Sequence, residues 1–230
     1  SKNPDIKNYT CAVVHGYPLV VAESDEPHRR HGIGFDNPIF HWYDDRLKVK
    51  QTAAYLNKTF GIDLGLARDA IREADKAMDG FRDTMAAEGR KVMDSLKGTD
   101  RFAVLVAGRP YHADQLVNHN VSNHFAKLGI PVLTLEALPE IFEQDFSNVR
   151  MEAFNPFHGR MLGAALYAAN HPNLELAQIV SFGCGHDAII TDEMIRIMRT
   201  KADKEMLVLK LDEGETTGPM NIRIKSFIET

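Results

Sequence analysis

The sequence has only two cysteines, Cys11 and Cys184, and they lie far apart in the chain. Two distant cysteines do not form the disulfide framework of a small secreted protein, so we expect a cytoplasmic protein in a reducing compartment. No apolar run reaches the roughly 20 residues that a membrane-spanning helix requires. The polar N-terminus has no signal-peptide core. We therefore expect no membrane partner and no export.

The chain also lacks an excess of basic residues. Its 27 Lys and Arg residues against 32 Asp and Glu residues give a formal net charge of −5. Nucleic-acid-binding proteins usually concentrate positive charge on one face, so this balance argues against nucleic acid as a partner. The nucleophile-elbow motif, the P-loop, the dinucleotide-binding glycine loop and the Cys-x-x-Cys pair are missing as well. Their absence disfavours a serine hydrolase, a P-loop ATPase and an ordinary nicotinamide dehydrogenase.

Residues 1–98 predict an N-terminal strand-and-loop segment followed by a long helix, together forming part of a lobe. In residues 11–22, two short apolar runs are separated by Gly16 and Pro18, which mark a turn or bulge. The stretch that follows, as far as His41, is irregular and charged, as a long loop is. This part therefore predicts little regular structure before residue 45.

Two helices are expected next. Residues 45–60 have a helical pattern that stops at Gly61, a typical residue at a helix C-terminus. Residues 67–96 predict a long amphipathic helix that braces or connects two lobes. Its apolar stripe, which we expect to be buried, consists of Ile71, Ala74, Met78, Phe81, Met85, Val92 and Leu96.

From residue 99 to residue 230, apolar runs alternate with helical patterns. This alternation predicts an α/β domain with an open, parallel, Rossmann-like sheet over residues 101–230. The expected strands are 102–107, 130–134, 178–182 and 206–211. The expected helices are 114–128, 158–169 and 191–199, with a last amphipathic segment after the fourth strand.

Ligands of open parallel sheets bind beyond the carboxyl ends of the strands. Three loops rich in glycine and polar residues follow such ends, at 108–112, 182–187 and 212–215. Arg109 in the first of them is suited to hold a phosphate or a carboxylate with its planar guanidinium. The alternative is an ion pair with Asp114 across its own turn. The sequence leaves both open.

Cys184 lies between two glycines, directly after a buried strand and shortly before a helix. Backbone N–H groups approach such a sulfur closely, which favours a reactive thiol or an iron–sulfur ligand. The alternative is a cysteine that only fits a tight turn. A nucleophile would also need a base, for which His186 is a candidate by closeness alone. Cys11, taken by itself, is typical of a small buried apolar residue.

Three histidines lie in the predicted N-terminal loop. His28, His31 and His41 have spacings that bring imidazoles near one another, but a zinc site usually needs four ligands. Arg29 and Arg30 would repel a cation there. We therefore do not assign a metal site to this loop.

Four motifs in the order of this chain resemble one known family. They are Cys11 with His15-Gly16-Tyr17-Pro18, then Gly108-Arg109-Pro110-Tyr111-His112, then Ser181-Phe182-Gly183-Cys184-Gly185, and Asp212-Glu213-Gly214 with Ile222-Arg223-Ile224. The chain resembles the 2-hydroxyacyl-CoA dehydratase-like module of large proteins that activate such dehydratases, the acyl-CoA dehydratase activase-related proteins. The resemblance covers nearly the whole chain.

The resemblance implies an iron–sulfur protein of anaerobic metabolism that transfers electrons at low potential. It makes Cys11 and Cys184 candidate ligands of a [4Fe–4S] cluster, and Arg109, Tyr111 and His112 candidate cofactor-binding residues at its rim. It implies an ATPase activator domain or a dehydratase subunit as partner. Dehydratase subunits commonly offer three cysteines, whereas this chain has two. A further ligand then comes from elsewhere, or the cluster is absent.

Two other functions stay open. The chain is alternatively a non-catalytic scaffold that docks an ATPase or dehydratase partner after losing its cluster. The other open function is a thiol-dependent acyl-transfer enzyme that uses Cys184. The sequence leaves a homodimer open and does not identify a substrate.

Overall fold

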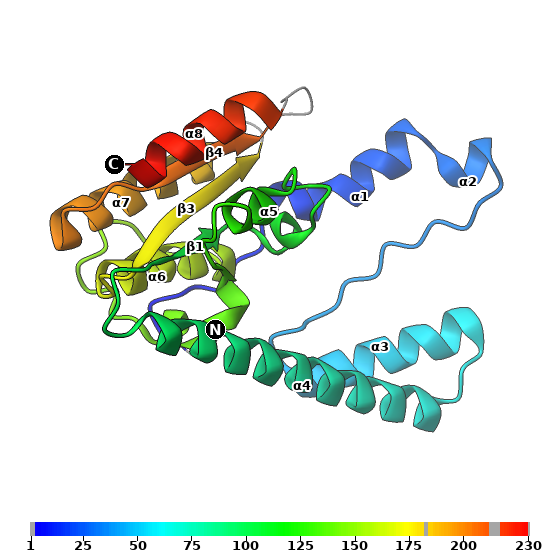
Figure 1. The fold of residues 1–230 in the computed structure, drawn as a ribbon. Helices are drawn as coiled ribbons and strands as arrows, with labels where there is room; N and C mark the ends of the chain where they lie inside the picture. The colour runs from blue at the N-terminus through cyan, green and yellow to red at the C-terminus, as the bar shows by residue number, and fades with distance from the viewer. Residues whose placement is uncertain (1–2, 182–183, 212–216, 230) are drawn as a thin grey trace. The chain divides into compact units, whose positions relative to one another are not determined.

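The computed structural model describes residues 3–181, 184–211 and 217–229 (Figure 1). Its helices are α1 (Ala12–Ser24), α2 (Pro27–Arg30), α3 (Asp45–Phe60), α4 (Leu64–Leu96), α5 (Val121–Ala126), α6 (Pro156–Ala169), α7 (Gly185–Ala202) and α8 (Thr217–Glu229). Its 3₁₀ helices are η1 (Pro110–Ala113), η2 (Leu135–Ala137) and η3 (Pro139–Glu143), and its strands are β1 (Ala103–Ala107), β2 (Val132–Thr134), β3 (Leu174–Ser181) and β4 (Leu207–Leu211).

The chain divides into two compact units. The larger unit contains Ser1–Lys7 and Arg82–Thr230, and the smaller unit contains Asn8–Phe81. The larger unit contains the sheet and nearly all of the buried apolar side chains in the described residues. Over those same residues, no helix combines the length and the apolar character that crossing a bilayer requires.

The four strands form one parallel sheet in the order β2-β1-β3-β4, which confirms the predicted open α/β fold (Figure 1). Leu105 of β1 is aligned with Leu133 on one side and with Leu176 on the other. The central strand β1 is a continuous apolar run because helices cover both faces of the sheet.

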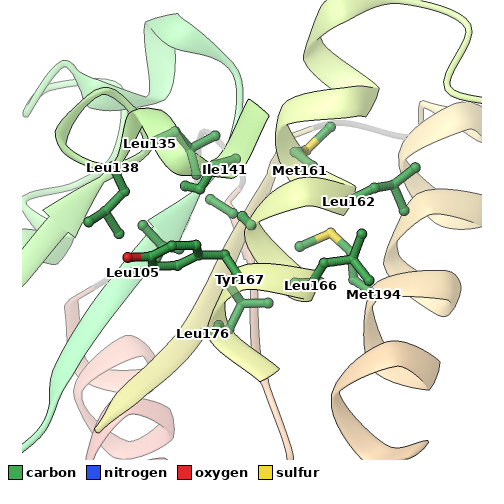
Figure 2. Packing of buried hydrophobic residues seen from close by; sticks show 14 of the residues in the cluster. Leu105, Leu135, Leu138, Ile141, Met161, Leu162, Leu166, Tyr167, Leu176 and Met194 are labelled. Atoms are coloured by element: carbon green, nitrogen blue, oxygen red, sulfur yellow. The ribbon is translucent and has the colours of Figure 1, made fainter. Parts of the chain in front are cut away.

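Two helices pack on each face of the sheet. Leu105 and Leu176 point to one face and pack in a cluster with side chains of α6 and α7, among them Met161 and Met194 (Figure 2). Val104 of β1 points to the other face and packs in a second cluster with residues of α5 and α8. A doubly wound sheet of this kind brings the loops that follow its strands to one edge.

The sequence of α6 explains where this helix begins and how closely it packs. Asn155 precedes the helix, and its side-chain oxygen accepts a hydrogen bond from the backbone N–H of His158 at 3.0 Å. Pro156 occupies the first turn, where its missing N–H costs nothing. A Cβ at Gly163 would lie 2.3 Å from the carbonyl oxygen of Ile141, so only glycine allows this approach to η3.

The prediction of strand and loop for residues 11–22 is wrong. These residues form α1, a helix that continues through Pro18. Val13, Val14, Tyr17, Val20 and Val21 recur at intervals of three and four, the period of a helix. The prediction treated Pro18 as a break, whereas the helix continues past it. None of the α1 residues is buried.

Three further elements differ from their predictions. The segment predicted as a helix over residues 114–128 contains only the short α5. Asn120, directly before α5, takes a left-handed backbone conformation and so prevents a continuous helix. The strand β3 begins at Leu174 and α7 begins at Gly185, both earlier than predicted. The polar Glu175 concealed the start of β3, because it interrupts the apolar residues that precede Gln178.

The apolar stripe of α4 is buried only in part. Leu96 is fully buried, and Met85 and Val92 pack against the core of the larger unit. Met78 and Phe81, by contrast, are about half exposed. The expectation of a stripe buried along the whole helix is therefore wrong for the part of α4 that belongs to the smaller unit.

Replacing Gly89 of α4 by alanine is expected to destabilise the larger unit by about 1–3 kcal/mol. A Cβ at Gly89 would lie 2.0 Å from the backbone carbonyl oxygen of Ala137, so the helix has to shift. Gly80→Ala in the same helix is the matched control, since a Cβ there meets no atom within 4 Å. The control should gain up to about 1 kcal/mol of helix propensity. Urea unfolding measures both, and equal effects of the two substitutions would contradict the close packing of α4 on η2.

Candidate functional site

The order in which the chain adds strands to the sheet reverses between the carboxyl ends of β1 and β3. From β1 the chain continues to β2 on one side, and β3 returns to the other side of β1. The loops after β1 and β3 therefore diverge to opposite faces and leave a crevice between their starts, which is where ligands of such sheets bind. Of the three loops predicted at this edge, 108–112 and the described part of the second, residues 184–187, flank the crevice.

Arg109 and Asp187 form a buried ion pair across this crevice. An Nη of Arg109, in the loop after β1, donates to a carboxylate oxygen of Asp187 at 2.7 Å. The side chains are 13% and 4% exposed. Burial opposes the charge of Arg109, but the Asp187 carboxylate outweighs it and raises the pKa of the guanidinium. Of the two sequence alternatives for Arg109, the pairing with Asp114 is wrong, because the Asp114 carboxylate accepts from the backbone of its own turn.

Cys184 lies at the N-terminus of α7, beside the same guanidinium. The Nη group of Arg109 that binds Asp187 also lies 3.4 Å from the sulfur of Cys184. The cysteine is half-buried and is the residue directly before the 18-residue helix α7. A cation and a helix N-terminus both suit a sulfur with negative charge, as a metal-bound thiolate has.

His112 holds the loop after β1 in place. Its Nδ1 accepts a hydrogen bond from the backbone N–H of Arg109 at 3.0 Å. A Cβ at Gly108 would lie 2.6 Å from this nitrogen, so glycine is required there. Burial lowers the pKa of His112 to about 4, and the charge of Arg109 adds to the effect against the opposing Asp187. The neighbouring ring of Tyr111 packs edge-on against His112 and is 45% exposed.

His158 in the first turn of α6 completes the buried part of the site. Its Nε2 accepts from the Asn155 amide at 3.3 Å, because the oxygen of that amide is already bound to the backbone. Its ring lies 5.3 Å, centroid to centroid, from the ring of His186 in the first turn of α7. Burial lowers the pKa of His158 to about 4, and the positive charges of His186 and Arg109 add to this effect. His158 is therefore a neutral imidazole at pH 7.

The structure brings together four of the five residues that the sequence singled out. Arg109, Tyr111, His112 and Cys184 all lie at the carboxyl edge of the sheet in the larger unit. Cys11 belongs to the smaller unit, where it is half-buried and directly precedes α1. The predicted rim segment 212–215, like Phe182 and Gly183, lies outside the described residues.

The described residues contain no ready-made metal site. None of their His, Cys, Asp and Glu side chains form a group of three or more that is arranged to hold a metal ion. The segment predicted as one long loop contains the short helix α2, and its His28, like His31 after it, is exposed. The Nδ1 of His41 contacts the side chain of Gln51.

Sequence reasoning overlooked two residues of this site and one buried polar residue in the adjoining strand β3. Asp187 stands in the same motif as Cys184, and an acidic residue in the first turn of a helix after a buried strand was the available signal. His158 sits three residues after an N-cap asparagine, a position that places it at the same edge. Gln178 is fully buried within β3, and its side-chain oxygen has no partner. No sequence pattern identified it.

The fold and the site together define a doubly wound α/β protein with a cysteine and a buried arginine–aspartate pair at its switch point. A family model described as CoA enzyme activase uncharacterised domain (DUF2229) matches residues 1–138, more than half of the chain. The chain belongs to this CoA enzyme activase family. No curated protein and no solved structure matches the chain.

Proposed function

We propose that this chain is the dehydratase-like module of a CoA enzyme activase system and that its sheet edge takes part in low-potential electron transfer. The carrying observation is the position of Cys184. Its sulfur is half-buried at the switch point, 3.4 Å from the guanidinium of Arg109. Membership of the activase family supports the association with acyl-CoA chemistry.

The donor set of the larger unit does not fit a complete cluster site. A cubane cluster takes four protein ligands, usually cysteine thiolates. Cys184 is the only cysteine of this unit, and no triad of metal-binding side chains surrounds it in the described part of the chain. The proposal therefore assigns one ligand position to Cys184, a second to Cys11, and the remaining ligands to protein outside this chain.

The partner in this proposal is an ATPase activator domain or a dehydratase subunit. Arg109 binds Asp187 and also contacts the sulfur of Cys184, so it holds the cysteine side chain in place. Tyr111 and His112 form the adjoining rim, and the partly exposed ring of Tyr111 is accessible to such a partner.

Anaerobic reconstitution with iron and sulfide tests this assignment. In the presence of the partner, the chain should take up iron and sulfide in equal amounts and develop visible charge-transfer absorption. Cys184→Ala should lower the iron content about tenfold or more. Even the loss of a residue that only orients a metal ligand commonly lowers metal affinity by about tenfold. Cys11→Ala, in the other unit, shows separately whether the ligand set extends beyond the sheet edge. Colourless, iron-free protein from every preparation would overturn the cluster assignment.

A second candidate function is a docking module without a cluster. The apolar surface of α1 favours it, since Val13, Val14 and Leu19 are each more than 60% exposed and the helix has no buried residue. Exposed apolar surfaces of this kind mark interaction sites. Iron-free protein that still binds an immobilised ATPase domain would support this function over the first.

A further inference from the structure

A cavity of about 420 Å³ lies near the start of β3, away from the crevice described above. Its lining residues come from the last turns of α4, from the start of η3, from the end of α6 and from the loop before β3, all within the larger unit. Small-molecule sites in proteins commonly have volumes of about 300–1,000 Å³. The proposed electron-transfer function, at the carboxyl ends of the strands, makes no use of this cavity.

Two lining side chains of opposite charge have no partner in the part of the chain that the structure describes. They are Arg90 of α4, which is exposed, and Glu140 of η3, which is half-buried. They also do not pair with each other. Lys97, which lines the same cavity, is by contrast paired with Asp94 at 2.6 Å. The cavity therefore offers one cation and one anion that remain accessible to a ligand.

The surroundings of Glu140 suit an ammonium group. Burial and the nearby Glu140 carboxylate raise the pKa of Tyr167, which also lines the cavity. The ring of His171 stacks on that of Tyr167 with centroids 4.0 Å apart. The Nδ1 of His171 donates to the backbone carbonyl of Tyr167 at 2.7 Å, so Nε2 of the neutral ring is an acceptor. A carboxylate, an acceptor nitrogen and aromatic rings all favour a bound cation.

The charges and the apolar part of the lining restrict the occupant. A phosphate would be repelled by Glu140, and a simple amine would leave Arg90 without a counter-charge. A molecule with both a carboxylate and an ammonium group satisfies the two residues at once. Met93, Leu96 and Leu138 add apolar surface to the same cavity. A small zwitterion with an apolar substituent therefore matches the lining.

We propose that this cavity binds a free α-amino acid with an apolar side chain. The carboxylate of the amino acid pairs with Arg90, its ammonium group binds Glu140 and Nε2 of His171, and its side chain contacts Met93 and Leu138. The chain then has a second ligand site, separate from the crevice at the carboxyl ends of the strands.

L-Methionine and two analogues with one charge each test the site on iron-free protein. N-Acetyl-L-methionine lacks the ammonium charge, and L-methioninamide lacks the carboxylate. Titrated into ¹⁵N-labelled protein, methionine should shift the backbone amides of Arg90 and Glu140 saturably. Each analogue should bind at least about tenfold more weakly, because it leaves one charged group of the protein without its counterpart.

Two variants assign the ends of the ligand. Arg90→Gln should weaken the binding of methionine but not that of methioninamide, and Glu140→Gln should weaken methionine but not N-acetylmethionine. Glu143→Gln is the control, since Glu143 lies in the same 3₁₀ helix and does not line the cavity. Equal binding of the three probes, no saturable shift with methionine, or equal effects of all three variants would overturn the proposal and leave a solvent-filled cavity only. None of these outcomes depends on whether the protein takes up iron.

Discussion

Replacing Arg109 by methionine is expected to lower the free energy of unfolding of the larger unit by about 3–5 kcal/mol. The substitution leaves the Asp187 carboxylate, 4% exposed, without its cation. An uncompensated charge in the interior is far costlier than the loss of one contact, because no water replaces the missing partner. Native-state hydrogen exchange of the β1 and β3 amides reports on this unit alone.

Two further variants separate the cost of an unpaired buried charge from the contribution of the ion pair itself. Adding Asp187→Leu to Arg109→Met should recover most of the lost stability, since an apolar pair of similar volume needs no desolvation of charge. Arg199→Met is the control, because Arg199 lies in the same helix as Asp187 and forms an exposed ion pair with Glu205. The side chains of Arg199 and Glu205 are 59% and 60% exposed. The control should lose little stability, because solvent screens the charges of an exposed pair. A loss from Arg109→Met no larger than that of the control would contradict a buried, structurally required pair.

Acidification between pH 6.5 and pH 4 is expected to destabilise the larger unit by about 3 kcal/mol for each of two histidines. Burial holds the pKa of His112 and His158 at about 4 in the folded protein, against 6.5 as the ordinary value. Well above pH 6.5 both states contain neutral imidazoles, so these residues then contribute no pH dependence. Between 6.5 and 4 the unfolded chain binds protons that the folded chain does not, so stability falls with falling pH.

Urea unfolding at a series of pH values measures this slope. His158→Gln removes one titrating group and should reduce the loss between pH 6.5 and 4 by about half, whatever its effect at pH 7. The double variant with His112→Gln should remove most of the remainder. A slope unaffected by both substitutions would show that the two imidazoles are not held neutral.

The sheet was the most predictable part of this fold. Residues 102–107 and 206–211 are apolar runs long enough for a strand and too short for an independent helix, and β1 and β4 lie there. Helix α3 was equally predictable, because Gly61 after Phe60 takes the left-handed conformation that ends a helix. Residues 11–22 were not, since Gly16 and Pro18 argue for a turn while the apolar spacing argues for a helix. When two local sequence patterns favour different structures, the sequence alone does not show which structure forms.

The predicted site depended on topology more than on motifs. Arg109 and Cys184 were placed at one edge by the rule for parallel sheets, and their atoms lie 3.4 Å apart. The role of either as a cofactor or metal residue stays a prediction. The sequence offered Asp114 as one alternative partner of Arg109, because it is near in sequence, whereas the actual partner Asp187 is near only in space.

The amino-acid sequence by itself determined that strands and helices alternate and that glycine-rich loops follow the strands, because burial on two faces imposes apolar runs of recognisable length. Only the tertiary structure decided that Arg109 meets an aspartate 78 positions away. It also decided that two histidines are buried as neutral rings and that Arg90 and Glu140 line one cavity. These features depend on the order of strands in the sheet and on desolvation by distant segments. A local pattern contains neither.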